Sequence, residues 1–209
     1  MVDYDADYFE RGIMSGKSCY TDYRWIPELT LPLAMSYIDV LNIRRDETVL
    51  DYGCAKGFMV KALRMLHRQA WGCDISQYAI DSADEDTAQH LMLSSEKDLV
   101  PFGKFFDYIL SKDVFEHVEY DNINRTLAIL STYGKILFAT IPLGNGERYN
   151  VPAYELDVTH KIRESKDWWI KKLEGNGWRV SRFDYLIAGI KDNWGHYPQG
   201  NGFFICERR

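Results

Sequence analysis

The sequence contains no long apolar run, no cysteine pair and no internal repeat. No stretch of the 209 residues approaches the roughly 18 apolar residues of a membrane-spanning helix, and the first five residues do not resemble a signal peptide. The cysteines are scattered without a C-x-x-C pair, which argues for reduced thiols and against zinc: Cys19, Cys54, Cys73 and Cys206. We therefore expect a cytoplasmic protein with no membrane attachment and no metal site.

The chain also has fewer positively than negatively charged residues. The chain has 25 Lys and Arg residues against 31 Asp and Glu residues, a net charge of −6, which argues against affinity for nucleic-acid phosphates. Apolar residues make up 46% of the chain and charged residues 27%, which excludes a disordered chain. Aromatic residues reach 14%, enough to line a pocket as well as a core. The length fits one domain, residues 1–209.

Apolar periodicity predicts strands that alternate with helices. Residues 48–50 read as a buried strand that ends at Asp51, and the apolar residues between Met59 and Leu66 recur at helical spacing. Similar patterns predict strands at 70–73, 90–93, 106–110, 136–141, 179–187 and 203–207, and helices that begin near 27, 57, 76, 123 and 165. This order is typical of an α/β fold: a mostly parallel sheet with helices on both faces and one antiparallel edge strand. Such sheets bind ligands at the carboxyl ends of their strands.

The first predicted strand leads into a glycine-rich turn, residues 51–57, which reads Asp-Tyr-Gly-Cys-Ala-Lys-Gly. A dinucleotide-binding turn would need glycines at positions 53, 55 and 58, but Ala55 and Phe58 occupy the last two. The Asp51 carboxylate would repel a pyrophosphate and suits a ligand with an ammonium group. S-adenosylmethionine has that group and also a ribose diol, to which Asp74 at the end of the next strand can bind. The alternative is a capping aspartate beside turn glycines, with no ligand.

Four segments, in order, resemble the motifs of class I S-adenosylmethionine-dependent methyltransferases: residues 49–58, 72–76, 106–118 and 134–142. The resemblance covers roughly residues 45–145 and implies a seven-stranded Rossmann-like sheet with a reversed last strand. It also implies an enzyme of the EC 2.1.1 type, with S-adenosylmethionine as cofactor and S-adenosylhomocysteine as product. The cofactor-binding residues expected on this basis are Asp51, Gly53, Cys54, Ala55, Gly57, Asp74, Ile75, Ser95, Glu96, Ser111, Lys112 and Tyr20.

Two positions depart from the family pattern. Ala55 stands where a glycine is frequent, a change that is tolerated if its φ is negative. Ser95 stands where an acidic residue often meets the adenine amine, and Glu96 or Asp98 could substitute for it.

The single domain divides into three parts. Residues 1–40 form an N-terminal lid and helical segment, residues 45–145 the cofactor-binding core, and residues 146–209 the acceptor-side loop, a helix and the last two strands. The first 25 residues are rich in tyrosine and precede the first strand, so we expect a mobile lid over the cofactor. An arm packed permanently on the sheet edge is the alternative.

The five histidines include the candidate catalytic bases. His160 ends the sequence Asp-Val-Thr-His, in which Asp157 could orient the ring, so these two residues are the first candidates. His117 lies close to the expected methyl position and is the second candidate, and His196 is the third. The alternative for His160 and Asp157 is that they only brace their loop. His67 and His90 are expected to be structural.

The acidic surface and the aromatic-rich ends of the chain favour a small-molecule or glycan hydroxyl as acceptor, with methylation of oxygen preferred over nitrogen. Protein acceptors stay open, and so do a non-catalytic binding module and a nicotinamide oxidoreductase. The Gly16-Lys17-Ser18 triplet is not a P-loop, because Arg11 stands where a glycine is needed and no strand precedes it. No G-x-S-x-G motif points to a hydrolase.

Overall fold

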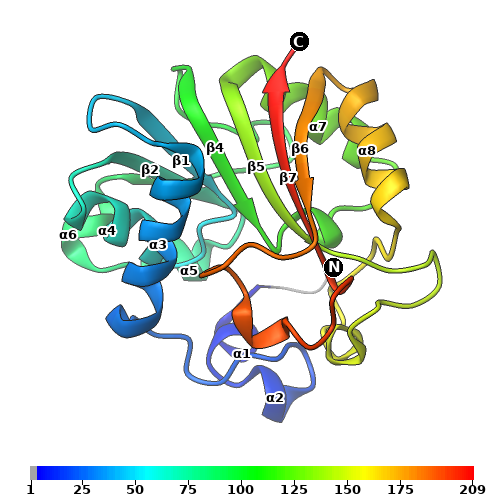
Figure 1. Cartoon of the computed structure of the whole chain (residues 1–209). Coiled ribbons are helices and arrows are strands. Elements are labelled where there is room, and N and C mark those ends of the chain that lie inside the picture. The colour runs from blue at the N-terminus through cyan, green and yellow to red at the C-terminus, as the bar shows by residue number, and fades with distance from the viewer. Residues whose placement is uncertain (1–3) are drawn as a thin grey trace.

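Seven strands form one sheet in the order β3-β2-β1-β4-β5-β7-β6. The computed structural model describes residues 4–209, and Figure 1 shows the sheet at the centre of the molecule with helices around it. The strands are β1 Thr48–Tyr52, β2 Gln69–Asp74, β3 Leu91–Leu93, β4 Phe106–Lys112, β5 Gly134–Pro142, β6 Trp178–Asp184 and β7 Asn201–Arg208.

The sheet confirms the predicted α/β fold with a reversed last strand. Strands β1 to β5 pair in parallel, whereas β7 pairs antiparallel with both β5 and β6. The reversed strand lies one place in from the edge, so β6 and β7 together form the antiparallel edge of the sheet. Burial explains this order, because β7 is apolar and mostly buried while the residues of β6 are mostly exposed or half-buried.

The helices cover both faces of the sheet, and successive strand residues point to two different cores. Leu50 and Leu137 pack on the side of α7 and α8, while Val49 and Phe138 pack on the side of α3 and α4. The helices are α1 Ala6–Phe9, α2 Gly12–Ser15, α3 Pro27–Leu41, α4 Phe58–Met65, α5 Gln77–Asp81, α6 Glu85–Ala88, α7 Ile123–Tyr133 and α8 Lys166–Gly175, with 3-10 turns η1 Phe115–His117, η2 Pro152–Leu156 and η3 Asp192–Trp194.

Local sequence signals account for where the main helices begin. The Ser76 hydroxyl accepts a hydrogen bond from the backbone N–H of Ala79 at 3.0 Å, and the Ser165 hydroxyl accepts one from Trp168 at 3.4 Å. Both residues are therefore the N-caps that the sequence predicts. The helix expected to begin near residue 27 is α3, with its proline at the first helical position.

The N-terminal segment, defined here as residues 4–25, lies at the carboxyl ends of the parallel strands. It contains two one-turn helices, α1 and α2. Figure 1 shows these helices beyond the end of the sheet toward which β4 and β5 point, beside the connections that follow β5 and β6. Residues 1–3 of the expected lid lie outside the described residues. Within residues 4–209, no helix has the length and apolar character needed to cross a bilayer.

Candidate functional site

Hydrogen bonds from the turn between β1 and α4 join the carboxyl ends of β1 and β2. The backbone N–H of Gly53 donates to the carbonyl oxygen of Cys73 at 2.8 Å. The Asp74 carboxylate accepts from the backbone N–H of Ala55 at 2.7 Å and from that of Ser76 at 2.8 Å. Asp74 therefore fixes both this turn and the start of α5. Burial raises the pKa of Asp74, while these two backbone donors oppose the shift.

Three residues of the turn have left-handed backbone conformations. Their φ angles are 81° at Gly53, 48° at Ala55 and 76° at Gly57. The two glycines adopt this region freely, but an alanine there brings its Cβ close to the following carbonyl oxygen. The condition under which the sequence suggested that an alanine is tolerated here, a negative φ, is therefore not met. Its N–H must point at Asp74, and this hydrogen bond holds the turn in the strained conformation.

A cavity of about 490 Å³ lies over the turn, between the N-terminal segment, α3 and the end of β4. Asp51 is one of the residues that line this cavity, and it is only 7% exposed. Its carboxylate accepts no hydrogen bond from the described part of the chain. Burial and then the charge of Asp74 raise the pKa of Asp51 to about 7, while Lys112 opposes the shift. The protein therefore compensates this acid only in part.

The structure brings together about half of the residues expected on the cofactor side. The cavity is lined by Asp51, Gly53, Cys54, Ala55, Lys112 and Tyr20, and Gly57 and Asp74 support the turn. The remaining four expected residues neither line the cavity nor support the turn: Ile75 and the 95–96 turn are exposed, and Ser111 is buried in the sheet with a hydroxyl that has no hydrogen-bond partner among residues 4–209. Contacts of Ile75, Ser95, Glu96 and Ser111 with a ligand stay predictions.

Two lysines hold an aspartate at the end of β4. The Asp113 carboxylate accepts hydrogen bonds from the amines of Lys112 and Lys191. Burial pushes the pKa of Asp113 upward, but the two ammonium groups hold it well below its usual range. Sequence reasoning missed Lys191, since it comes from the connection between β6 and β7, 78 residues from Asp113.

The N-terminal segment packs over the Asp74 side of the site. The Ser76 hydroxyl donates to the carbonyl oxygen of Tyr4. The carboxylate of Glu10 accepts from the Lys56 amine and, at 2.9 Å, from the Tyr78 hydroxyl. The segment thus lies across the carboxyl ends of the strands, and its movement as a lid stays a prediction.

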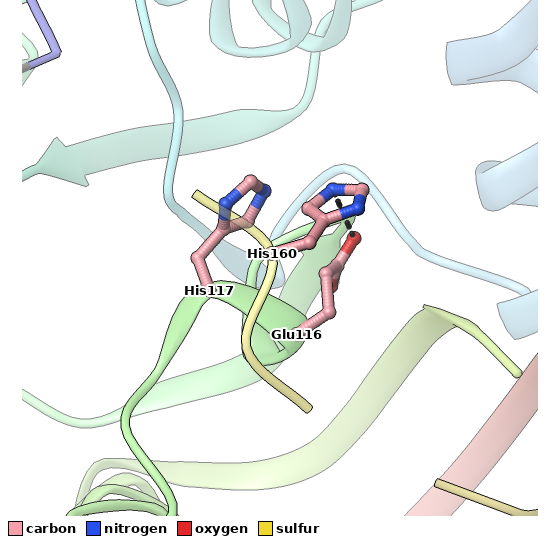
Figure 2. Close-up of side chains that lie close together, drawn as sticks. All are labelled: Glu116, His117 and His160. Carbon is pink, nitrogen blue, oxygen red and sulfur yellow. Dashed lines mark ion pairs between the residues drawn. The ribbon is translucent and has the colours of Figure 1, made fainter. Parts of the chain in front are cut away.

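Glu116, His117 and His160 form a cluster next to this segment, which we call the histidine cluster. Glu116 and His117 belong to η1, just beyond β4, and His160 belongs to the connection between β5 and α8. The backbone N–H groups of Lys161 and Ile162 donate to the carbonyl oxygen of Glu116, at 2.7 and 3.0 Å. These bonds place the two imidazole rings side by side, with centroids 4.6 Å apart (Figure 2).

Hydrogen bonds fix the tautomer of each ring in the cluster. The Thr159 hydroxyl donates to the Asp157 carboxylate, so its oxygen accepts the Nδ1 proton of His117 at 2.7 Å. His160 donates its Nδ1 proton to the carbonyl oxygen of Tyr154 at 2.8 Å. Both rings therefore keep Nε2 as a free lone pair.

The expectation that Asp157 orients the ring of His160 is wrong, because the Asp157 side chain binds other residues. Asp157 accepts hydrogen bonds from the backbone and side chain of Thr159, and from the Tyr8 hydroxyl at 2.9 Å. The side chain folds back onto its own turn, as a short acidic side chain in a loop commonly does. Asp157 therefore orients His117, through Thr159.

Glu116 is fully buried, and neither of its carboxylate oxygens has a hydrogen-bond partner within the part of the chain that the structure describes. Oε1 lies 4.0 Å from Nε2 of His160, the contact dashed in Figure 2. Burial and then Asp113 raise the pKa of Glu116 well above its usual value, and burial and then His160 lower the pKa of His117 to about 4. His196, the third candidate base, is outside the cluster and stacks near Trp194 and Tyr197.

Comparisons with known proteins agree with the fold. The family model of the methyltransferase domain matches residues 24–185. A search of curated sequences gives no significant match.

Solved structures with this fold include a putative methyltransferase of Haloferax volcanii in complex with the Trm112 methyltransferase activator. It is 17% identical, with a TM-score of 0.67 over 87% of this chain and 91% of that chain. An S-adenosylmethionine-dependent methyltransferase of Clostridium acetobutylicum is 12% identical, with a TM-score of 0.63 over 97% and 96%. Magnesium protoporphyrin IX methyltransferase of Synechocystis, solved with bound S-adenosylhomocysteine, is 15% identical, with a TM-score of 0.62 over 86% and 82%. At these identities the similarity shows the fold alone.

Substitutions in the turn test its left-handed geometry. Gly53→Ala should lower the free energy of unfolding by at least about 1–2 kcal/mol, because φ is positive and the added Cβ would lie 2.3 Å from Cγ2 of Val114. Ala55→Gly should not destabilise the protein, since the relief of strain offsets the roughly 0.5–1 kcal/mol entropic cost of a glycine. Urea unfolding of both variants measures the difference. A loss above about 1 kcal/mol in Ala55→Gly would contradict the conformation described here.

Proposed function

The chain belongs to the methyltransferase domain family, and we propose that it transfers a methyl group from S-adenosylmethionine to a hydroxyl oxygen of a small molecule or glycan. S-adenosylmethionine supplies the electrophilic methyl group on its sulfonium sulfur. The protein supplies binding, alignment of the acceptor and exclusion of water, and alignment alone can contribute roughly 7–11 kcal/mol to such reactions.

The observation that carries this proposal is the state of Asp51. A buried carboxylate without a hydrogen-bond donor faces a cavity at the carboxyl end of the first strand. Leaving such a group uncompensated is costly, and an ammonium group in the cavity would relieve that cost. The amine of the methionine part fits this need, whereas a phosphate would add to the repulsion. A dinucleotide cofactor is therefore disfavoured.

Asp74 is the second anchor that we assign to the cofactor. Its two oxygens each accept one backbone N–H, and a carboxylate oxygen has lone pairs for a further donor. The hydroxyls of a ribose could use these positions. Tyr4 currently packs against this side, so adenosine binding would require the N-terminal segment to shift.

The histidine cluster is the acceptor side of the proposed site. A hydroxyl must lose a proton as it takes the methyl group, and the free Nε2 atoms of His117 and His160 provide basic groups for this. Nearby acidic groups and aromatic rings suit an uncharged polar acceptor, among them Tyr149 and Tyr154 beside His160. N-methylation of a small molecule or protein is the second candidate reaction, and a non-catalytic module of this fold is the third.

Turnover tests the proposal directly. Incubation with S-adenosylmethionine and a library of hydroxylated metabolites and glycans should give S-adenosylhomocysteine together with a product heavier by one methylene unit. Mass spectrometry of the product identifies the methylated atom. S-adenosylhomocysteine binding without any acceptor turnover would favour the non-catalytic module, and binding of NAD in its place would exclude the proposal.

The pH dependence of cofactor affinity tests the role of Asp51. Because burial raises its pKa to about 7, the free protein holds Asp51 protonated below that pH, and binding an ammonium group must release the proton. Affinity for S-adenosylhomocysteine should thus fall by up to about tenfold for each pH unit below 7 and level off above it.

Calorimetry in buffers of different ionisation enthalpy measures this proton release. Asp51→Asn should bind more weakly and lose the pH dependence, whereas the exposed control Glu85→Gln should keep both properties. A pH-independent affinity in the unmodified protein would contradict the assignment of Asp51.

A ligand that lacks the ribose diol separates the two roles of Asp74. Asp74→Ala should weaken S-adenosylhomocysteine binding at least about tenfold, since each hydrogen bond to a charged group contributes roughly 1.5–3 kcal/mol. The same substitution also frees the turn, so part of this loss is structural. For a 2′,3′-dideoxy analogue of the ligand the loss should be clearly smaller. Equal losses for both ligands would show that Asp74 acts only on the turn.

Hydrogen exchange tests whether the N-terminal segment moves. Its amides in residues 4–25 should gain protection when S-adenosylhomocysteine binds, because the segment contacts Lys56, Ser76 and Asp157 around the proposed site. Amides of β5 in the sheet serve as an internal control and should not change. Equal protection of the segment with and without ligand would favour a permanently packed arm.

A further inference from the structure

We propose that Glu116, His117 and His160 bind a divalent transition-metal ion. Each residue offers one ligand atom, and the three atoms lie within 4.8 Å of one another. Two imidazole nitrogens and one carboxylate oxygen are a donor set that suits zinc, manganese or iron in the divalent state. The sequence alone predicted no metal site, since its cysteines lack any metal-binding spacing. The two histidines are 43 residues apart in the chain, at 117 and 160.

The unpartnered state of Glu116 is the first argument for a ligand. The side chain is fully buried, and among residues 4–209 neither oxygen has a hydrogen-bond partner, although proteins pair nearly all buried polar atoms. Its Oε1 points to the free Nε2 of His160 at 4.0 Å, as Figure 2 shows. A cation between these atoms would give the carboxylate the partner that the chain does not supply.

The hydrogen bonds behind the two rings are the second argument. Histidines that bind metals almost always donate their other ring N–H to a carbonyl or carboxylate, which fixes the ring and the tautomer. His160 does so to the carbonyl oxygen of Tyr154, and His117 does so to Thr159, which is held by the Asp157 carboxylate. Both rings are thus prepared as neutral donors through Nε2.

The dimensions of the histidine cluster are those of an open site. Bonds of about 2.0–2.1 Å to zinc in a tetrahedron require ligand atoms about 3.4 Å apart. The ligand atoms lie within 4.8 Å of one another, with 4.0 Å between Glu116 and His160, so side-chain rotations must bring them closer together around an ion. Three protein ligands leave at least one coordination position for water or a substrate oxygen.

Neighbouring charges also permit a cation here. Lys112 and Lys191 lie nearby, but both are bound to Asp113, which compensates part of their charge. Asp157 adds a second carboxylate behind His117. Besides Glu116, the carboxylates of Asp113 and Asp157 therefore act electrostatically on the cluster and favour a cation there.

The use of this metal in catalysis rests on the proposed function, while its binding does not. The ion would lower the pKa of an acceptor hydroxyl that occupies its open coordination position, so the acceptor proton would be lost to water at neutral pH. The freed oxygen electron pair then forms the bond to the methyl carbon, and the electrons of the carbon–sulfur bond stay on sulfur. No oxidant or reductant is required.

Metal titration of chelator-treated protein tests the inference without any activity measurement. Calorimetry with Zn²⁺ and Mn²⁺ should give one equivalent per chain, and Co²⁺ should show visible ligand-field absorption. Glu116→Gln, which keeps the shape of the side chain, and His160→Gln should each weaken binding about a hundredfold or more, and Thr159→Val about tenfold. The matched control His196→Ala removes an exposed histidine outside the cluster and should bind as the unmodified protein does.

Circular dichroism establishes that each variant is folded. If Glu116→Gln does not fold, the stoichiometry of the unmodified protein and the loss in Thr159→Val decide. The inference would be overturned if none of the three ions bound at one equivalent per chain. It would also be overturned if Glu116→Gln and His160→Gln bound the ions as tightly as the unmodified protein. Metal binding without methyl transfer to any acceptor would contradict the proposed function only, and full turnover by metal-free protein would show that the imidazoles act directly as bases.

Discussion

The Asp74 carboxylate, by accepting hydrogen bonds from Ala55 and Ser76, holds two strand ends and two helix starts in one arrangement. The turn after β1 can keep its left-handed residues only because this acceptor fixes the N–H of Ala55. The cavity over Asp51 exists because that turn keeps the backbone close to the sheet. The buried carboxylate of Asp74 therefore determines the shape of the cavity around the buried carboxylate of Asp51.

Most of the fold could be predicted from the sequence, because the signals are local. The first strand, the capping residues Ser76 and Ser165, and the helix from Pro27 depend on neighbouring residues only, and the structure confirms them, with the strand ending at Tyr52 instead of Asp51. The position of β7 next to β5 was not predicted. It depends on which strand is apolar enough to be covered on both faces, which shows only when β6 and β7 are compared as neighbours.

In the candidate site too, residues in short local motifs were predictable from the sequence, whereas those that depend on long-range contacts were not. The residues around Asp51 and Asp74 lie in two short motifs, and sequence reasoning found most of them. Glu116 was missed, because nothing in the letters Phe-Glu-His reveals that the carboxylate is buried without a partner. The partner of Asp157 was assigned to the wrong histidine, since the connection after β5 folds back against η1 through backbone bonds that sequence spacing does not encode.

The N-terminal segment connects the two halves of the proposed site through hydrogen bonds, so its displacement would make them thermodynamically dependent on each other. Tyr4 is hydrogen-bonded to Ser76 beside the turn, and Tyr8, one helical turn further on, is hydrogen-bonded to Asp157 behind the histidine cluster. A ligand that displaces the segment at one end changes the hydrogen bonding at the other. By linkage, the factor by which the first ligand alters the affinity of the second equals the factor in the reverse direction. The order in which two substrates bind is then set by how tightly this short stretch of chain is held.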